Sequence, residues 1–191
     1  MFGSAKRLAA NYRREGGYYL IELRLSEARR LFNSFDPAPF LEKDLDNEAE
    51  SYIVDTVKEF PLEAPLKLLI HLPESEHGSR ESESIPEAVR HYFDYRAHHA
   101  AMNLRFLMQQ GRASLAIGLL FLFGCIVARQ ALAGGNGVVG EIVGEGLLIC
   151  GWVAMWRPIQ IYLYDWWPIQ RMRRIYEKIH AMPIELRKIG S

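Results

Sequence analysis

Two apolar stretches decide the fold of this chain: residues 113–133, ASLAIGLLFLFGCIVARQALA, and residues 138–156, VVGEIVGEGLLICGWVAMW. Each has about 20 residues and would extend about 30 Å as an α-helix, which is the thickness of the hydrocarbon core of a membrane. The alternative is a buried helical hairpin in a soluble protein, but neither stretch has the polar face that a globular helix needs. The sequence therefore predicts an integral membrane protein with a helical hairpin at residues 113–156.

Basic residues predict the orientation of this hairpin, because Lys and Arg beside membrane spans stay in the cytoplasm. They flank its two outer ends, namely Arg96, Arg105, Arg112, Arg157, Arg171, Arg173, Arg174 and Lys178. The turn has only Arg129 at its edge. We therefore expect both termini in the cytoplasm and residues 130–140 outside. Residues 1–17 form a basic segment without the continuous apolar core of a cleavable signal peptide, and Phe2 excludes an N-myristoylation signal.

Charge is distributed unevenly, although the chain has a formal net charge of zero and 24% charged residues. Acidic residues dominate residues 36–87, which argues against nucleic acid as the main ligand. The N-terminal and juxtamembrane segments are basic, which predicts contacts with anionic lipid headgroups.

Residues 18–85 have the pattern of a small cytoplasmic α/β domain. Alternating apolar residues predict strands at residues 18–25 and 66–72. Between them we expect a short helix over residues 26–32, capped by Ser26, and a longer helix that begins at Asp44 or Asp46 and ends at Phe60. A crossover of about 40 residues is typical of a parallel βαβ unit.

Two strands are too few for a stable sheet and leave edges unpaired. The sequence therefore predicts a homo-oligomer that pairs these two strands with a second copy. Residues 74–84 are charged and rich in serine, which predicts a mobile loop. From Pro86 nothing breaks a helix before about Leu132, so residues 86–112 are expected to form a stalk that continues into the first span.

Residues 157–191 follow the second span and have the composition of the headgroup region. Four aromatic residues occur within residues 162–167, between Pro158 and Pro168, and basic residues come next. We expect this segment to turn along the membrane surface. The amphipathic stretch that ends near Ile179 would then lie on the bilayer or pack on the stalk.

His91, Asp94 and His98 are the strongest candidates for chemistry, because they share one face of the expected stalk helix. Such a face would supply part of a transition-metal site or sense pH near neutrality. The simpler interpretation, which we favour, is an amphipathic helix with an ordinary ion pair between Asp94 and His98.

The second candidate lies in the hairpin, where Glu141 and Glu145 share a face and Arg129 lies on the same outer side. Ionisable groups in a bilayer often mark ion or proton paths. We favour a structural pair in which Arg129 binds Glu141 or Glu145. Small residues four apart also predict close packing of the spans, namely Gly140 with Gly144 and Gly124 with Ala128.

The sequence lacks the known motifs for calcium binding, disulfide formation, nucleotide binding and nucleophilic catalysis. The acidic residues 42–50 lack the glycine and the closing glutamate of a calcium loop. Cys125 and Cys150 lie at different depths of the two spans and are too far apart for a disulfide. The sequence has no P-loop, dinucleotide-binding fingerprint, nucleophile elbow or CxxC motif. It therefore predicts no catalytic, cofactor-binding or metal-binding residue and no cofactor.

Three segments together resemble a family of small bacterial two-span membrane proteins without an established function: LFNSFDPAPFLEKDLD at residues 31–46, LKLLIHLP at residues 66–73 and RPIQIYLYDWWPI at residues 157–169. The resemblance covers most of the chain and implies a location in the bacterial inner membrane. It implies no substrate and no site.

These inferences give an α+β, largely α-helical membrane protein: a small cytoplasmic βαβ-type domain on a long helix that runs into a two-helix transmembrane hairpin. The expected function is a membrane-anchored homo-oligomeric scaffold or assembly protein, which is not an enzyme. Its expected partners are a second copy of itself, anionic lipid and another membrane protein, and not nucleic acid. The alternatives are a channel or transport accessory subunit and, third, a metal-dependent membrane enzyme.

Overall fold

The computed structural model describes residues 12–133 and 137–189. The chain divides into two compact units. The first, which we call the α/β unit, comprises Met1–His99 and Met172–Ser191, and the second, the hairpin unit, comprises Ala100–Arg171. The protein is thus a mixed α/β chain, and each unit is described by itself.

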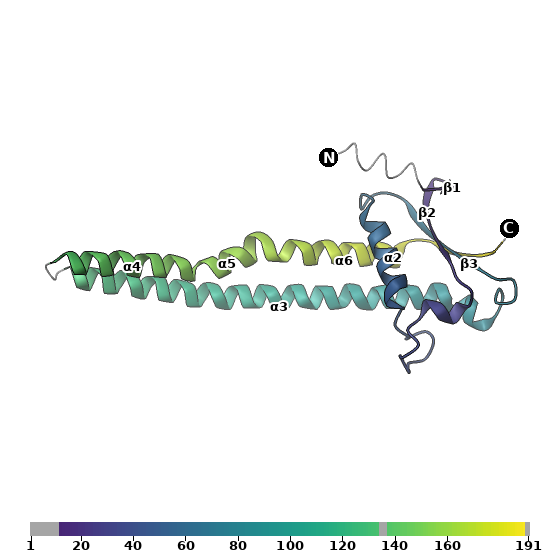
Figure 1. Cartoon of the computed structure of the whole chain (residues 1–191), viewed down its shortest axis with the longest axis horizontal. Helices are drawn as coiled ribbons and strands as arrows, with labels where there is room; N and C mark the ends of the chain where they lie inside the picture. Colours follow the sequence, from purple (N-terminus) through teal and green to yellow (C-terminus); the bar gives the residue numbers. More distant parts are fainter. Residues whose placement is uncertain (1–11, 134–136, 190–191) are drawn as a thin grey trace. The chain divides into compact units, whose positions relative to one another are not determined.

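A four-stranded sheet forms the centre of the α/β unit, in the order β1 (Arg14–Glu15), β2 (Tyr18–Arg24), β3 (Leu66–Leu72) and β4 (Ile184–Lys188) (Figure 1). Strands β2 and β3 are parallel, with Tyr19 opposite Leu66 and Leu23 opposite Ile70. The predicted parallel βαβ unit is therefore confirmed. The expectation of only two strands was wrong, because β1 and β4 extend the sheet on both sides.

Strand β1 joins β2 through a tight hairpin turn at Gly16 and Gly17. Both glycines have positive φ angles, 58° and 89°. Two-residue hairpin turns require such angles, and glycine adopts them without the steric cost of a Cβ atom. The turn places Arg14 opposite Tyr19 in an antiparallel pair.

Strand β4 comes from the predicted interfacial tail. It pairs in parallel with β3, with Leu68 opposite Ile184 and Leu72 opposite Lys188. We predicted residues 157–191 as one interfacial segment. For residues 184–188 this was wrong, because they form a strand of the sheet. The segment Ile184–Lys188 follows Pro183, whose carbonyl accepts from Leu68 N–H, and its backbone completes the ladder of β3.

Two helical segments connect β2 with β3. The first is a single 3₁₀ turn, η2 (Ala28–Leu31), and the second is α2 (Asn47–Lys58). Asp46 caps α2, since its carboxylate accepts from the N–H groups of Glu48 and Ala49. Ser26 does not cap η2 as predicted, because its hydroxyl instead accepts a hydrogen bond from Arg30.

Helix α3 (Arg80–Ala133) is one continuous helix, as predicted, but it begins earlier than expected. We predicted a loop over residues 74–84, and this was wrong for residues 80–84, which belong to α3. Ser79 supplies the missing start signal, because its side chain accepts from Ser82 N–H. Glu81 and Glu83 then place negative charge at the positive end of the helix.

The core of the α/β unit lies on one face of the sheet. Alternate residues of β3 (Leu66, Leu68, Ile70 and Leu72) are at most 2% exposed. Buried stripes come from α2, from the start of α3 and from the end of α6 (Trp166–Ala181), namely Ile53, Val57, Ile85, Val89, Phe93, Ile175 and Ile179.

Packing of the Phe93 and Tyr176 rings, with centroids 6.1 Å apart, joins α3 to α6. This confirms that the amphipathic stretch packs on α3, one of the two placements expected for it.

In the hairpin unit, α3 and α4 (Val138–Ala154) lie side by side (Figure 1). After α4 the chain stays helical through α5 (Trp156–Gln160), a π-helical turn η3 (Ile161–Asp165) and α6. Pro158 is the third residue of α5, in the first turn after Met155, where a helix does not need its N–H group. Pro168 lies just after the π-helical turn η3. The segment between these prolines is therefore helical, and its position along a membrane surface stays a prediction.

Candidate functional site

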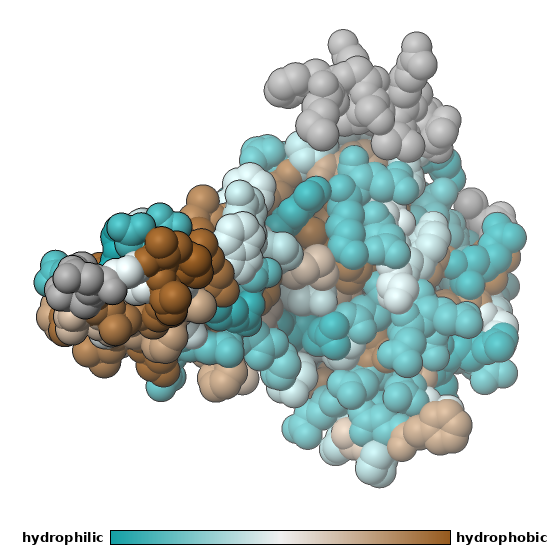
Figure 2. Space-filling view, turned by 60° about the vertical axis from the view of Figure 1, so that its left-hand side comes forward, coloured by the Kyte–Doolittle hydropathy of each residue, from teal (hydrophilic) through white to brown (hydrophobic). Residues whose placement is uncertain are grey.

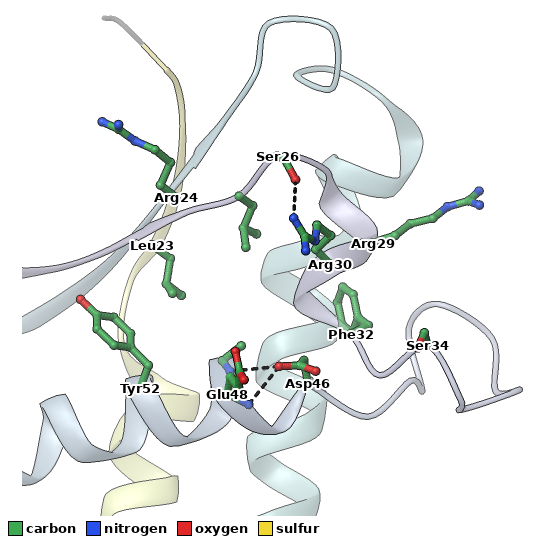
Figure 3. A pocket seen from close by; sticks show the side chains of 12 residues that line it. Leu23, Arg24, Ser26, Arg29, Arg30, Phe32, Ser34, Asp46, Glu48 and Tyr52 are labelled. Carbon is green, nitrogen blue, oxygen red and sulfur yellow. Dashed lines mark hydrogen bonds between the residues drawn. The ribbon is translucent and has the colours of Figure 1, made fainter.

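A cavity of about 770 Å³ lies beside the end of β2 in the α/β unit (Figure 3). One wall is β2 and the loop that follows it, the second is η2, and the third is the start of α2. The lining residues are Leu23, Arg24, Leu25, Ser26, Arg29, Arg30, Phe32, Ser34, Asp46, Glu48, Ala49 and Tyr52. It therefore combines an apolar floor with charged side chains of both signs.

The side chains of this cavity come from opposite faces of β2. In Figure 3 Leu23 points toward Tyr52, whereas Arg24 extends to the other side of the strand. Tyr52 is 47% exposed, and its hydroxyl donates to the backbone carbonyl of Glu22 over 3.2 Å. Arg30 donates to Ser26 Oγ over 3.2 Å, and Arg29 forms two hydrogen bonds with Glu81 of 2.8 and 2.6 Å.

A second polar cluster lies between α2, α3 and α6. Glu50 accepts hydrogen bonds of 2.8 Å from Tyr92 and from Arg96, and only 13% of its side chain is exposed. The same Arg96 donates to the hydroxyl of Tyr176 over 3.1 Å, and its guanidinium lies over the Tyr176 ring, 5.3 Å from the centroid. Every buried side-chain nitrogen and oxygen in the described residues has a hydrogen-bond partner.

Burial and charge shift the pKa values in this cluster in favour of the observed pairing. Burial raises the pKa of Tyr92, and the adjacent Glu50 carboxylate raises it further. Burial alone would lower the pKa of Arg96, but the Tyr176 hydroxyl and the negative charge of Glu50 raise it. The cluster is therefore an ion-pair network that joins three helices.

The opposite face of the sheet carries a network of ion pairs at its surface. Glu185 on β4 binds both Lys67 on β3 and Arg187 on its own strand, the latter over 2.6 Å. Arg187 also binds Glu15 on β1. Hydrogen bonds from Lys67 and Arg187 lower the pKa of Glu185. Leu69, which alternates with Lys67 on the same face of β3 and lies opposite Glu185, is fully buried.

Glycines allow the two helices of the hairpin unit to approach closely. A Cβ atom on Gly151 would lie 2.7 Å from Leu122 and 3.3 Å from Cys125, and one on Gly118 would lie 3.1 Å from Ala154 O. The predicted role of Gly144 in close packing is confirmed, since its Cβ would lie 3.2 Å from Arg129 Cγ. Gly124 does not take part, because the described chain leaves more than 4 Å of open space around it.

The outer surface of the hairpin unit is apolar. Figure 2 shows a brown, apolar surface over this part of the molecule. Large apolar side chains are exposed on both helices, namely Ile117, Leu119, Leu120, Phe121, Phe123, Val138, Val139, Ile142, Ile149, Trp152 and Val153. The helical stretches 80–132 and 138–181 are long and apolar enough to cross a membrane, by length and composition. Only 11% of the most apolar window of each is buried, which differs from the core helix of a soluble protein.

The structure does not assemble the histidine candidates into a metal site. His91 and His98 are exposed on α3, and His98 Nδ1 lies 3.4 Å from an Asp94 oxygen. This is the ordinary i, i+4 pair of the simpler interpretation. Among the residues described, no three His, Cys, Asp or Glu side chains are grouped closely enough to hold a metal ion.

The predicted ion pair of Arg129 is not formed. Within the described residues no carboxylate of Glu141 or Glu145 lies in ion-pair distance of Arg129. The aliphatic stem of Arg129 instead lies across Gly144, where the missing side chain leaves room. The cysteines are as expected: both are free, with Cys125 buried and Cys150 exposed. The glycine-rich turn at residues 134–136 lies outside the described residues.

No family model, curated protein or solved structure matches the chain. The cavity beside β2 and the cluster around Glu50 were both missed by sequence reasoning. Tyr92 and Arg96 are one helical turn apart, which could have indicated a shared polar face. Nothing in the local pattern points from that face to Glu50 or Tyr176, because these contacts depend on the tertiary fold.

Proposed function

We propose that this protein is a membrane-anchored homo-oligomeric scaffold of the bacterial inner membrane, with no chemistry of its own. Its hairpin unit crosses the bilayer with both termini in the cytoplasm, and its α/β unit binds other proteins there. The resemblance of residues 31–46, 66–73 and 157–169 to a bacterial two-span family supports the choice of membrane.

The observation that carries this proposal is the side-chain distribution in the hairpin unit. Glycines lie between the helices, and large apolar side chains lie on the outside. Exposing apolar area to water costs about 25 cal/mol per Å², whereas exposing it to lipid does not. A bilayer is therefore the solvent that fits this surface.

Self-association is proposed through the hairpin rather than through sheet edges. Pairing of β3 with a second copy loses its basis, because β3 has neighbours on both sides within one chain. Gly124 supports the hairpin as the contact, since it has open space around it and Ala128 follows one turn later. Small residues at this spacing let helices approach each other in a membrane.

The intact mass of the protein in a mild detergent tests this proposal. A scaffold of this kind has a mass that is a multiple of the 22.0 kDa chain. Gly124→Leu should shift it to the single-chain mass, because a Cβ atom at this position meets nothing of its own hairpin within 4 Å and the larger side chain would occupy the space proposed for a second copy. Leu119→Phe is the matched control on a different face of the same helix, where the residue is 50% exposed.

A single-chain mass for the unmodified protein would contradict the oligomer. Two further measurements on the same sample address the alternatives. Stoichiometric metal in elemental analysis would favour the metal-dependent enzyme. Ion flux in liposomes that disappears with Glu145→Gln would favour the channel.

A further inference from the structure

Strand β2 presents an edge beside the cavity. Parallel strands use alternate residues for pairing. Tyr19 N–H donates to Pro65 O and Leu25 N–H donates to His71 O, so these residues of β2 face β3. The intervening residues face the opposite edge, where Leu20 N–H donates to Arg13 O. Beyond Leu20, no strand within residues 12–133 and 137–189 pairs with this edge.

One backbone group of this edge has a side-chain partner in place of a strand. The carbonyl of Glu22 points away from β3 and accepts from the Tyr52 hydroxyl over 3.2 Å. A neighbouring strand would supply an N–H group at this position. Tyr52 is half exposed on α2, and its hydroxyl occupies a site that an added strand would use.

The two faces of the edge differ in chemistry. Leu23 and Leu25 line the cavity, with the ring of Phe32 beyond them. Arg24 extends to the other face, where it is exposed (Figure 3). An added strand would therefore place one set of alternate side chains over Leu23 and Leu25, the apolar part of an otherwise charged cavity. The other set would lie beside Arg24, where the neighbouring Glu22 carboxylate is already paired with Arg13 and His71.

We propose that the outer edge of β2 binds an extended segment of a partner protein in which apolar and acidic residues alternate. The segment adds a strand to the sheet, its apolar side chains enter the cavity over Leu23, and its carboxylates lie beside Arg24. Two acidic residues also line the cavity, but Asp46 already accepts from two backbone N–H groups and Glu48 is exposed at the rim. This inference deepens the proposed scaffold, because it names the class of partner that the α/β unit recruits.

Fluorescence anisotropy of labelled peptides on the full-length protein in detergent tests the inference. The probe is the capped peptide Thr-Val-Glu-Val-Glu-Val-Thr, and the controls replace both glutamates by lysine or the central valine by proline. We expect saturable binding of the acidic peptide. The lysine peptide should bind at least about tenfold more weakly because of Arg24, and so should the proline peptide because it lacks a ladder N–H.

Two variants assign the binding to this edge. Arg24→Glu should reverse the preference between the acidic and lysine peptides, whereas Arg90→Glu, an exposed arginine elsewhere in the same unit, should leave it unchanged. Tyr52→Phe should tighten binding by about two- to tenfold, because the Glu22 carbonyl no longer has a competing donor.

Four results would overturn the inference: no saturable binding, equal binding of acidic and lysine peptides, equal losses in Arg24→Glu and Arg90→Glu, or displacement of the probe by a peptide of residues 1–11. The last would assign the edge to the chain's own N-terminus. Each leaves membrane anchoring untouched. Conversely, a chain that does not enter membranes could still bind the peptide, so the two proposals fail separately.

Discussion

Arg187 on the last strand of the sheet binds Glu15 on the first, across β2 and β3. Its Nη1 donates to Glu15 over 2.9 Å, and its Nε donates to Glu185 over 2.6 Å. One guanidinium thus joins two carboxylates that lie far apart in the sequence. The contact connects the two strands that the sequence did not reveal, and it ties the N-terminal hairpin to the strand that follows α6.

We therefore expect Arg187→Met to lower the melting temperature of the α/β unit more than Glu15→Gln does. The first change removes the partner of two carboxylates, and the second removes only one of the two pairs. Both effects should be small and should shrink in 1 M salt, as is usual for exposed pairs. Thermal unfolding followed by circular dichroism at low and high salt measures this, and equal effects of the two variants would contradict the network.

Acid should weaken the same sheet. Hydrogen bonds from Arg187 lower the pKa of Glu15, and those from Lys67 and Arg187 lower that of Glu185, below the ordinary value of 4.5. A carboxyl whose pKa is lower in the folded state stabilises the fold above its unfolded pKa, and this stability is lost as pH falls. The melting temperature should therefore decline below about pH 4.5, and less so in the double variant Glu15→Gln with Glu185→Gln.

The cluster around Glu50 predicts non-additive effects. Arg96→Met should destabilise the α/β unit by about 1 to 3 kcal/mol, because it leaves the buried Glu50 carboxylate without its charge partner. The double variant Glu50→Gln with Arg96→Met should be less destabilised than the sum of the two single variants. Urea unfolding of the four proteins gives this coupling, and strict additivity would mean that the pair contributes nothing.

Packing within the hairpin unit predicts a contrast between two glycines. Gly151→Val should lower its thermal stability in detergent, because even a Cβ atom would lie 2.7 Å from Leu122 and 3.3 Å from that residue's Cα. Gly146→Val should leave it nearly unchanged, since nothing in the described hairpin lies within 4 Å of a Cβ atom at this position. Similar losses in both variants would show that the helices pack through a different face.

The local alternation of apolar and polar residues predicted one strand of the sheet closely but could not predict the two short strands. Residues 66–72 alternate over a full strand, and their predicted bounds match β3. Strand β1 has only two residues, too few for a periodic pattern; the Gly16–Gly17 pair is a turn signal that we did not use. Strand β4 follows a basic amphipathic helix and has too short an alternation to be distinguished from a tail.

The candidate site depended even more on tertiary structure. The cavity beside β2 forms only when α2 packs near the strand, and nothing in the sequence places Tyr52 against the Glu22 carbonyl. For the histidines of α3, by contrast, the sequence suggested a metal site that the structure does not form. Their helical spacing places them on one face, but a shared face does not provide the further ligands that a metal site requires.

Cysteine labelling in intact cells tests most directly the central claim, that the hairpin unit crosses the membrane. In a background of Cys125→Ala and Cys150→Ala, the variants Val138→Cys, at the hairpin turn, and Ser34→Cys, in the α/β unit, are treated with a maleimide that does not cross membranes. The account predicts labelling of Val138→Cys in intact cells and of Ser34→Cys only after lysis. Labelling of both variants only after lysis, with the protein in the soluble fraction, would contradict it.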